Sequence, residues 1–561
     1  MNYKLIGTND YIFDPIFTVL SNRGVHDIGR FLNLDESVCI PYKKLKNIDR
    51  AVKCTMSHIE NKSKIFIMVD SDVDGYTSAS ILYQYIKKLS PEIHIYWEIH
   101  NGKEHGISNI DIPLDVSLVF VPDAGSNDFE KHKELKAQGI DVIVLDHHEI
   151  EEESKDAIVV NTRLGDYDNN NLSGAGVVYK FCKAIDAEMW LDYADQFLDL
   201  VALGNVSDLM SMKELETRFL VNKGLKNVSN SFFLALIDQQ SFSIKGKISI
   251  INISFYIAPL INATIRYGTR QDKENMFRAF IEEQIFVPYK PRGSKEEKIE
   301  PLAVNMARRC YNLRGKQNRD SAKITETLEK KIEVFNLDMN SVIVLDAKDD
   351  LINKNVTGLV ANKIASKYKK PVILFSSCDK DIYMGSARGY DKGELKDFKE
   401  VVLETKLFEY ALGHSNAYGV GIKESNLNTA ISELNNKLAD YNFEDYHTVD
   451  FDIHVNKLEE EFIYTIHRNG DIWGKGIEEP LILIREIPVI LDNVEIIGKQ
   501  KNVMKIEYFS ITYLIFKANK DILMNLKTRK SKFINVIGRA HVNKFLDITY
   551  PQIIVEAYEL I

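Results

Sequence analysis

The stretch KIFIMVDSDVDGYTSASILYQYIKKL (residues 64–89) decides the fold of this chain. After one lysine, residues 65–69 are all apolar, as in a strand that is buried on both faces of a sheet. Residues 77–89 carry apolar side chains at helical spacing. The polar segment DSDVDG (70–75) joins the two, so the chain passes from a strand through a turn of aspartates into a helix.

The same alternation continues to residue 160. Four further short apolar segments predict strands: IHIYW (93–97), SLVFV (117–121), VIVL (142–145) and AIVV (157–160). Helical stretches lie between several of them, and residues 173–225 have a mostly helical pattern. Short apolar strands that alternate with helices indicate an α/β fold with a parallel sheet covered on both faces.

The second half of the chain changes pattern twice. Residues 284–300 combine proline, glycine and a run of charges, which predicts a surface loop or an insertion. Residues 305–336 predict a long polar helix that connects two domains. A second α/β pattern then predicts strand 341–346, helix 356–368, strands 371–375 and 382–387, and helix 394–411. From about residue 447, short alternating strands separated by turns predict a small all-β domain of the barrel type.

The composition excludes several classes of protein. A chain of 561 residues corresponds to about three to four domains. Its 45% hydrophobic and 27% charged residues exclude disorder or a coiled coil for most of the chain. No apolar run approaches the ~18 residues that a membrane span needs, and the first residues lack a secretory signal pattern. We therefore expect a cytoplasmic protein without membrane contact.

Charge and cysteine content further limit the class of protein. The net charge is −10, from 71 basic and 81 acidic side chains. A negative sum argues weakly against a nucleic-acid partner, but a nuclease must gather carboxylates around metals, so the local distribution of charge matters more. The five cysteines are scattered without a CxxC pair, which argues against a disulfide framework and against a cysteine-based zinc site.

Acidic and imidazole side chains follow the ends of several predicted strands. They are Asp70, Asp72 and Asp74 after the first strand, Asp123 after SLVFVP, Asp146, His147 and His148 after VIVL, and Asp208 in ALGNVSDLM. In open parallel sheets, ligands bind at the carboxyl ends of the strands, near the point where the strand order reverses. Each group alone is compatible with a helix cap, a calcium-type turn or a surface turn, but together they predict one site. We expect Asp72 and Asp74 to face the same way in an extended turn, with Gly75 allowing the bend into the helix.

The chemistry of these groups points to metal ions. Carboxylates packed this closely repel one another, and divalent cations relieve that repulsion. Carboxylate and imidazole ligands without thiolate favour manganese or magnesium over zinc or iron. Two such ions about 3.5–4 Å apart activate a water and stabilise a phosphoryl oxygen, so no nucleophilic serine or cysteine is required. We expect one carboxylate, Asp123, to bridge the two ions.

The same motifs resemble those of a known family, the DHH phosphoesterases. The motifs of the catalytic domain are DSDVDG (70–75), PDAG (122–125), LDHHE (145–149) and GNVSD (204–208). Later segments similar to that family are APLINATIR (258–266), GSAR (385–388) and LGHSNAYG (412–419), the last two resembling its DHH-associated domain. WGKGIEEPL (473–481), VIGRAHVNKF (536–545) and PQIIVEAYEL (551–560) resemble the oligonucleotide-binding (OB) domain of RecJ-type single-strand exonucleases.

The resemblance implies roles for individual residues. The implied metal ligands are Asp72, Asp74, Asp123, His147 and Asp208. Asp70, Asp146 and His148 would lie beside the metals, and His148 would orient a phosphate or protonate the leaving oxygen. The implied substrate contacts are Asn262, Arg266, Arg319, Arg388, Gly413 and His414. The chain departs from the family pattern at Met68, Leu260, Leu412 and Tyr418, which affects substrate contacts more than the metal site.

The resemblance also implies a domain order. We expect an N-terminal extension (1–50), a DHH domain (51–225), a helical connector (226–336), a smaller α/β DHH-associated domain (337–446) and an OB-like domain (447–561). In the last domain, the basic residues Lys527, Arg529, Lys530 and Lys532 occur near Phe533 and Phe545, a combination that suits single strands.

The implied function is a 5′-to-3′ exonuclease on single-stranded DNA that uses two Mn²⁺ or Mg²⁺ ions, in DNA repair, recombination or replication. The expected partners are single-stranded DNA and a single-strand-binding protein or helicase, with the protein itself a monomer. Two alternatives remain open. One is a small-substrate phosphodiesterase acting on short oligoribonucleotides or cyclic dinucleotides, which we expect to lack the tail. The other is a non-catalytic single-strand-binding scaffold, which we expect to have lost the acidic residues.

Overall fold

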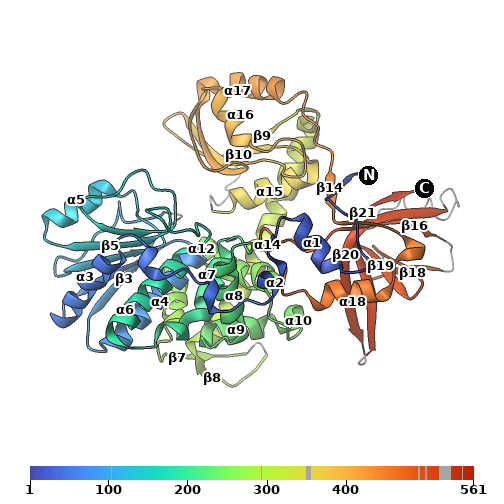
Figure 1. Ribbon diagram of the computed structural model, residues 1–561. Coiled ribbons are helices and arrows are strands. Elements are labelled where there is room, and N and C mark those ends of the chain that lie inside the picture. The colour runs from blue at the N-terminus through green and yellow to red at the C-terminus, as the bar shows by residue number, and fades with distance from the viewer. Residues whose placement is uncertain are drawn as a thin grey trace. The chain divides into compact units, whose positions relative to one another are not determined.

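The computed structural model describes residues 1–100, 102, 104–291, 293–348, 355–489, 493–498, 502–516, 518, 532–545 and 548–561 (Figure 1). The described chain divides into two compact units. We call Arg30–Asn318 with Trp473–Ile477 the aspartate unit, because it contains DSDVDG. We call Met1–Gly29, Arg319–Ile472 and Glu478–Ile561 the tail unit. Among the described residues, no helix combines the length and apolar character needed to cross a membrane.

A five-stranded sheet forms the centre of the aspartate unit. Its strands are β2 (Ile65–Val69), β3 (Ile95–Ile99), β4 (Leu118–Pro122), β5 (Asp141–Asp146) and β6 (Ile158–Asn161). The spatial order is β3-β2-β4-β5-β6, and all four pairings are parallel, which confirms the predicted parallel sheet. Successive β2 side chains join two different apolar clusters, since Ile67 packs in one and Met68 in the other. The sheet is therefore covered on both faces, as its apolar strands require.

Helices supply the two covering layers and their connections. Those of the aspartate unit are α3 (Ile48–Glu60), α4 (Val73–Leu89), α5 (Phe129–Ala137), α6 (Gly174–Met189), α7 (Leu198–Ser207), α8 (Leu215–Lys226), α9 (Ser231–Gln239), α10 (Ser241–Ile244), α11 (Ile250–Asn252), α12 (Ala258–Tyr267) and α13 (Arg270–Phe280). Short 3-10 or π turns occur at Glu36–Val38, Tyr42–Lys44, Ala194–Phe197 and Ile253–Ile257. The predicted connector helix is α14 (Leu302–Val334).

The segment predicted as a loop or insertion near 284–300 is partly regular. β7 (Phe286–Tyr289) and β8 (Lys298–Pro301) pair in an antiparallel hairpin. β7 alternates exposed and half-buried residues, a period-2 pattern that the proline and the charge run concealed in the sequence, whereas three of the four β8 residues are exposed.

The tail unit contains two larger sheets and a small one. The first has the order β12-β13-β11-β10-β9, formed by β9 (Ile343–Asp346), β10 (Val372–Asp379), β11 (Ile382–Arg388), β12 (Phe408–His414) and β13 (Ala417–Lys423). Its helices are α15 (Thr357–Tyr368), α16 (Phe398–Glu404) and α17 (Glu424–Lys437). The small sheet consists of β1 (Asn2–Leu5), which pairs in parallel with β14 (Tyr446–Val449). After β1 the chain forms α1 (Pro15–Asn22) and then α2 (Ile28–Leu32), which crosses the boundary between the units.

The seven-stranded sheet of the tail has the order β15-β16-β20-β21-β19-β18-β17. Its strands are β15 (Phe451–His454), β16 (Ile482–Pro488), β17 (Val494–Ile497), β18 (Val503–Tyr508), β19 (Ile511–Phe516), β20 (Phe533–Phe545) and β21 (Ile548–Leu560). This confirms the predicted β-rich C-terminal domain, although the segment also contains α18 (Glu460–Arg468). Of the expected basic run, Lys527, Arg529 and Lys530 lie outside the described residues, as does the side chain of Phe545.

One long predicted element is wrong. The helix expected over 394–411 is confined to α16, and the chain continues as strand β12. Lys406 adopts a left-handed backbone (φ 56°), which ends the helical path before the β-favouring residues FEY. The predicted N-terminal extension is divided between the two units, and the five-domain division stays a prediction.

The junction between β2 and α4 depends on close packing at Gly75. A Cβ on this residue would lie 2.6 Å from Cβ and 2.8 Å from Cα of Asp70, inside van der Waals contact. Gly75 lies within α4, so it serves a close approach of two backbone segments and not the bend that the sequence predicted. The same contact fixes the direction in which Asp70 leaves the sheet.

We predict that Gly75→Ala destabilises the aspartate unit by about 1–3 kcal/mol, because the added methyl overpacks a buried junction. Urea unfolding of the purified chain measures this change. The matched control is Gly29→Ala, whose Cβ would meet only Asp27 Oδ1 at 3.7 Å. Equal unfolding midpoints for the two variants would contradict the packing argument.

Candidate metal centre

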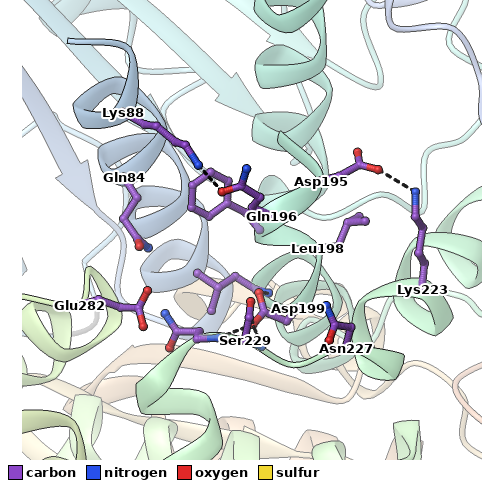
Figure 2. Close-up of a pocket in the computed structure, with 13 residues that line it drawn as sticks. Gln84, Lys88, Asp195, Gln196, Leu198, Asp199, Lys223, Asn227, Ser229 and Glu282 are labelled. Carbon is purple, nitrogen blue, oxygen red and sulfur yellow. Dashed lines mark hydrogen bonds and ion pairs between the residues drawn. The ribbon is translucent and has the colours of Figure 1, made fainter. Parts of the chain in front are cut away.

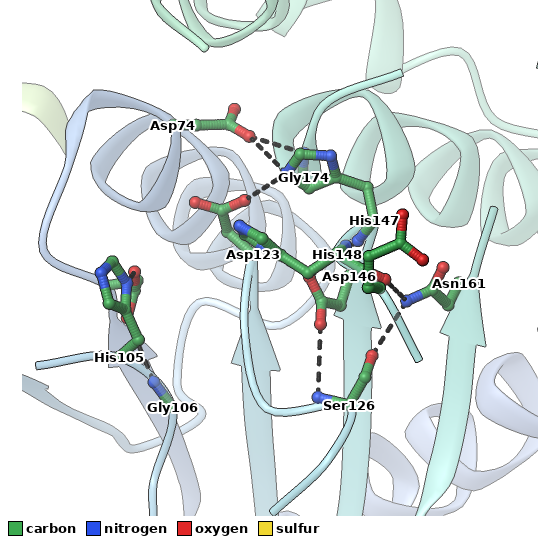
Figure 3. A network of polar contacts seen from close by, with 12 residues as sticks. Asp74, His105, Gly106, Asp123, Ser126, Asp146, His147, His148, Asn161 and Gly174 are labelled. Atoms are coloured by element: carbon green, nitrogen blue, oxygen red, sulfur yellow. Dashed lines mark hydrogen bonds and ion pairs between the residues drawn. The ribbon is translucent and has the colours of Figure 1, made fainter. Parts of the chain in front are cut away.

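The candidate site lies at the carboxyl edge of the parallel sheet (Figure 3). β2 pairs with β3 on one side and with β4 on the other, so the chain changes direction across the sheet at β2 and β4. Asp70 follows β2, Asp123 follows β4, and Asp146 ends β5. This is the switch point at which open α/β sheets bind ligands.

His147 gathers three carboxylates around one ring nitrogen. Its Nε2 lies 3.2 Å from Asp123 Oδ1, 3.5 Å from Asp208 Oδ2 and 3.9 Å from Asp74 Oδ2. Burial lowers the pKa of His147, which favours the neutral ring. Within the described part of the chain, the buried Nε2 has no hydrogen-bond partner, so a neutral nitrogen faces three carboxylates across a space that suits a cation.

A second group of carboxylates adjoins the first. Ligand oxygens of Asp70, Asp72 and Asp123 lie within 4.8 Å of one another. Neither oxygen of Asp123 has a hydrogen-bond partner among the described residues, although the side chain is buried. Burial and the charges of Asp74 and Asp72 raise the pKa of Asp123 well above its usual value. Asp123 is thus the carboxylate shared by both groups, and the described chain offers it no donor.

The backbone holds Asp123 in an unusual conformation. Its φ is 65°, in the left-handed region, and its N–H donates to the carbonyl of Leu145 at 2.8 Å. A non-glycine residue in this region costs roughly 1–2 kcal/mol. This backbone conformation directs the carboxylate toward His147 and Asp72.

The start of α4 differs from the predicted extended turn. α4 begins at Val73, and Asp72 is its N-cap, accepting a hydrogen bond from the N–H of Gly75 at 2.9 Å. Asp74 lies in the first turn of the helix. The physical reason is capping, since the Asp72 carboxylate satisfies a helix N–H that an extended turn would leave free.

Asp74 is held by the N-terminus of α6. Its two oxygens accept from the N–H groups of Gly174 and Ala175 at 2.6 and 3.1 Å. These amides carry the positive end of the helix dipole. A Cβ on Gly174 would lie 2.5 Å from Asp123 Oδ1, and one on Gly204 would lie 2.3 Å from Asp74 Oδ1. Only glycine allows both helices to approach the carboxylates this closely.

Asp146 positions the two histidines. Its Oδ1 accepts from the N–H of His147 at 2.7 Å and from Nδ1 of His148 at 2.8 Å, and its Oδ2 accepts from the N–H of Ser126 at 3.2 Å. The hydrogen bond from His148 lowers the pKa of Asp146 despite burial, and the same bond raises the pKa of His148 to about 9. Asp146 is therefore a hydrogen-bonded support for both histidines, and it also belongs to a group of possible ligands with Asp123, His147 and His148.

Sequence reasoning missed two histidines beside Asp70. Nδ1 of His105 lies 2.5 Å from Asp70 Oδ2, and Nε2 of His100 lies 3.4 Å from Asp70 Oδ1. The sequence position of His100 could have revealed it, because this histidine follows strand 93–97 and therefore lies at the same edge of the sheet. Ser126 and Asn161 were also missed; the Asn161 amide donates to Ser126 Oγ at 2.9 Å.

A pocket adjoins this cluster. It has a volume of about 360 Å³ and is lined by His105, Gly106, Ala124, Gly125, Ser126, Asn127, Asp128, Asp146 and His148. A larger pocket of about 520 Å³ lies elsewhere, at the N-terminal end of α7 (Figure 2). Asp208 caps the opposite end of that helix. The lysines of the larger pocket are engaged, Lys223 with Asp195 at 2.7 Å and Lys88 with Gln196. Of these two pockets, the smaller one is the one that adjoins the acidic cluster.

The predicted substrate contacts are divided between the units. Asn262 and Arg266 lie one turn apart on α12. Desolvation lowers the pKa of Arg266, and the negative charge of Asp72 partly opposes this effect. In the tail unit, Arg319 is exposed on α14 and Arg388 ends β11. Gly413 and His414 end β12, at the turn of the β12–β13 hairpin.

The four departures from the family pattern have different environments. Met68 and Leu260 are buried in the apolar clusters of the aspartate unit. Tyr418 is buried in the tail unit, and Leu412 is largely exposed. The substitutions at Met68 and Leu260 are therefore absorbed by the core, whereas Leu412 presents an apolar surface beside Gly413.

The metal-site roles can be tested through stability. We predict that Mn²⁺ raises the thermal midpoint of the chelator-treated wild type, because a ligand that binds only the folded state stabilises it. Asp123→Asn should abolish this increase. Without metal, the same variant should be at least as stable as wild type, because a repelling buried charge is removed.

Differential scanning fluorimetry measures these shifts. Asp168→Asn is the control, since Asp168 is an exposed carboxylate paired with Lys44. Loss of such a surface ion pair changes the free energy of unfolding by only about 0–1 kcal/mol. A full manganese shift in Asp123→Asn would contradict the assignment of Asp123.

Comparisons with known proteins agree with this geometry. A model of the DHH family N-terminal domain matches residues 64–205, and a model of the RecJ OB domain matches residues 449–557. A crystal structure of RecJ from Thermus thermophilus in complex with Mn²⁺ has a TM-score of 0.75 at 18% identity, covering 100% of this chain and 79% of that one. At this identity the likeness shows the fold.

Two relatives in Bacillus subtilis (strain 168) extend the match. RecJ, a single-stranded-DNA-specific exonuclease, is 26% identical over 533 residues, covering 91% of this chain and 63% of RecJ. The SPbeta prophage-derived protein YorK, provisionally named a single-strand DNA-specific exonuclease, is 45% identical over 567 residues, covering 100% of this chain and 98% of YorK. Because YorK is 45% identical over the full chain and the DHH and RecJ OB models match the two ends of this chain, this protein belongs to the DHH family, as a divergent RecJ-type member.

Proposed function

We propose that this protein is a divalent-metal-dependent exonuclease that hydrolyses phosphodiester bonds of single-stranded DNA from the 5′ end. The observation that carries the proposal is the position of Asp123. It is buried without a hydrogen-bond donor from the described residues, and it belongs to two adjacent groups of ligands. A divalent cation would relieve the repulsion that such an uncompensated carboxylate meets from its acidic neighbours.

The residues fit two oxygen-preferring cations. Asp74, His147 and Asp208 would hold one ion, and Asp70, Asp72 and Asp123 the other. Asp123 would be shared, because its Oδ1 also lies 3.2 Å from His147 Nε2. Manganese and magnesium are the candidates, since structures of Thermus thermophilus RecJ contain Mn²⁺ in one case and Mg²⁺ in another. When bound, the ions supply an activated water and neutralise charge on the phosphate.

The chain's own groups orient the substrate. Asp146 fixes the ring of His148 through Nδ1, and His148 lines the pocket beside the cluster, where it can donate to a phosphate or leaving oxygen. Arg266 lies near Asp72, and its guanidinium suits a phosphate oxygen. His100 and His105 hold Asp70 in place.

The tail favours a long single strand over a small substrate. The RecJ OB model matches residues 449–557, and the seven-stranded sheet occupies this region. OB domains bind single strands by combining basic grooves with aromatic stacking. The non-catalytic alternative is disfavoured, because the acidic residues of both ligand groups are present. The cytoplasmic location, the monomeric state and a protein partner such as a single-strand-binding protein or helicase remain predictions of the sequence.

The proposed activity predicts a specific digestion pattern. With Mn²⁺, the protein should degrade 5′-labelled single-stranded DNA to short products and leave blunt duplex and short RNA largely intact. Asp123→Asn should lower kcat by at least about 10³-fold, because several kcal/mol of transition-state charge stabilisation is lost. Asp168→Asn serves as the control and should retain activity.

Gel analysis of end-labelled substrates checks both polarity and specificity. Preferred hydrolysis of a dinucleotide or of short RNA would favour the small-substrate alternative. Single-strand binding without any metal-dependent hydrolysis would favour the scaffold.

The contribution of the tail should be tested by point substitution. Truncation at Tyr446 would also remove Trp473–Ile477, which packs in the aspartate unit, where the N–H of Met212 donates to the carbonyl of Lys475 at 2.7 Å. Phe533, 39% exposed at the start of β20 beside Lys532, is a suitable position.

We predict that Phe533→Ala weakens binding of a long single strand by about 5- to 150-fold, since stacking contributes ~1–3 kcal/mol per base. Dinucleotide hydrolysis should not change. Fluorescence anisotropy with labelled oligothymidine measures the affinity, and Phe242→Ala, at a 91% exposed phenylalanine of the aspartate unit, is the control. If the two variants bind equally well, the stacking role of Phe533 is wrong.

A further inference from the structure

A second cluster of metal-ligating side chains lies at the other end of β5. Cys54 and His58 are on α3, four residues apart and therefore on one helix face, and Asp141 is the first residue of β5 (Figure 1). Cys54 Sγ lies 3.7 Å from Asp141 Oδ2, and His58 Nε2 lies 3.0 Å from the same oxygen. Thiol, imidazole and carboxylate thus converge on one point from two elements.

These distances match the edges of a tetrahedral zinc site. With Zn–S about 2.3 Å and Zn–N and Zn–O about 2.0–2.2 Å, tetrahedral angles give S···O and N···O separations of about 3.6 and 3.3 Å. The observed 3.7 and 3.0 Å lie close to both values. Two edges of the site are therefore already close to zinc geometry, and all three ligand atoms lie within 4.8 Å of one another.

A neighbouring hydroxyl orients the histidine. Ser63 Oγ lies 3.0 Å from His58 Nδ1, in the turn after α3. A hydrogen bond at one ring nitrogen fixes the tautomer and directs the other nitrogen to a metal, as is usual for metal-bound histidines. Here it directs Nε2 toward Asp141. His58 is mostly buried, whereas the Asp141 side chain is 63% exposed, which leaves one face of the cluster open to water.

We propose that Cys54, His58 and Asp141 form a zinc site that is separate from the candidate metal centre, with water as the fourth ligand. Thiolate and imidazole ligands select zinc over the manganese or magnesium favoured by the acidic cluster. β5 runs from Asp141 to Asp146, so about 17 Å of strand separates the two sites. Zinc would tie α3 to the start of β5 and stabilise the aspartate unit.

This site was not visible in the sequence. The absence of a CxxC pair argued against a cysteine-based zinc site, but a single cysteine suffices when the fold brings Asp141 to a Cys–His pair on one helix. Burial and the charge of Asp141 raise the pKa of the Cys54 thiol to about 12, so the thiol is protonated until metal binds, and binding releases that proton.

Cobalt absorption tests the proposal in the full-length, chelator-treated protein. Co²⁺ bound to thiolate gives a charge-transfer band in the near ultraviolet. None of the ligand groups found among the described residues at the carboxyl edge includes a cysteine, so cobalt there gives no such band. We expect the band to saturate at one Co²⁺ ion per chain and to disappear when Zn²⁺ displaces the cobalt.

The variants separate the ligands from their surroundings. Cys54→Ser should abolish the band, and Ser63→Ala should weaken cobalt binding about 10- to 100-fold. Cys39→Ser is the control, since Cys39 is also half-buried but belongs to none of the ligand groups in the described chain. Manganese-dependent hydrolysis should persist in Cys54→Ser, so failure of this site is distinguishable from failure of the proposed activity. Absence of the band in wild type, or its persistence in Cys54→Ser, would overturn the proposal.

Discussion

The repulsion among buried carboxylates at one edge of a parallel sheet governs the structure of the aspartate unit. Desolvation and the neighbouring acids raise the pKa of Asp72 to about 6 and that of Asp208 to about 8. Protein groups relieve part of this cost, since α6 amides hold Asp74 and two histidines hold Asp70. Asp123 receives no such help from the residues that the structure describes. Divalent cations would offset the remaining cost, which is why the proposed site centres on Asp123.

Several locally unfavourable features occur at the carboxyl edge of the sheet, where the acidic side chains lie. Asp123 has a left-handed backbone, and glycines at positions 75, 174 and 204 let backbone and helices approach carboxylates at distances that no Cβ would permit. Strained or overpacked positions of this kind persist where the surrounding structure over-determines them, usually at functional sites. Their convergence at the switch point of β2 and β4 is an argument for function that is independent of the family match.

The parts of this structure that could be predicted depend on local sequence. The five parallel strands and their terminal acids could be identified because apolar runs and the residues after them are contiguous. The β12 strand was mistaken for helix, and α18 was missed, because tertiary context decides short amphipathic segments. His100 and His105 were missed because their link to Asp70 exists only in the folded chain. Cys54 and Asp141 are 87 positions apart and share no motif.

We propose that Asp123 is shared by two divalent cations. Anomalous diffraction from crystals grown with Mn²⁺ tests it most directly, because manganese positions are then seen without assumptions about the ligands. We predict two anomalous peaks about 3.5–4 Å apart, both within coordination distance of Asp123, with Asp74, His147 and Asp208 around one of them. A single peak, or two peaks of which only one contacts Asp123, would contradict this account.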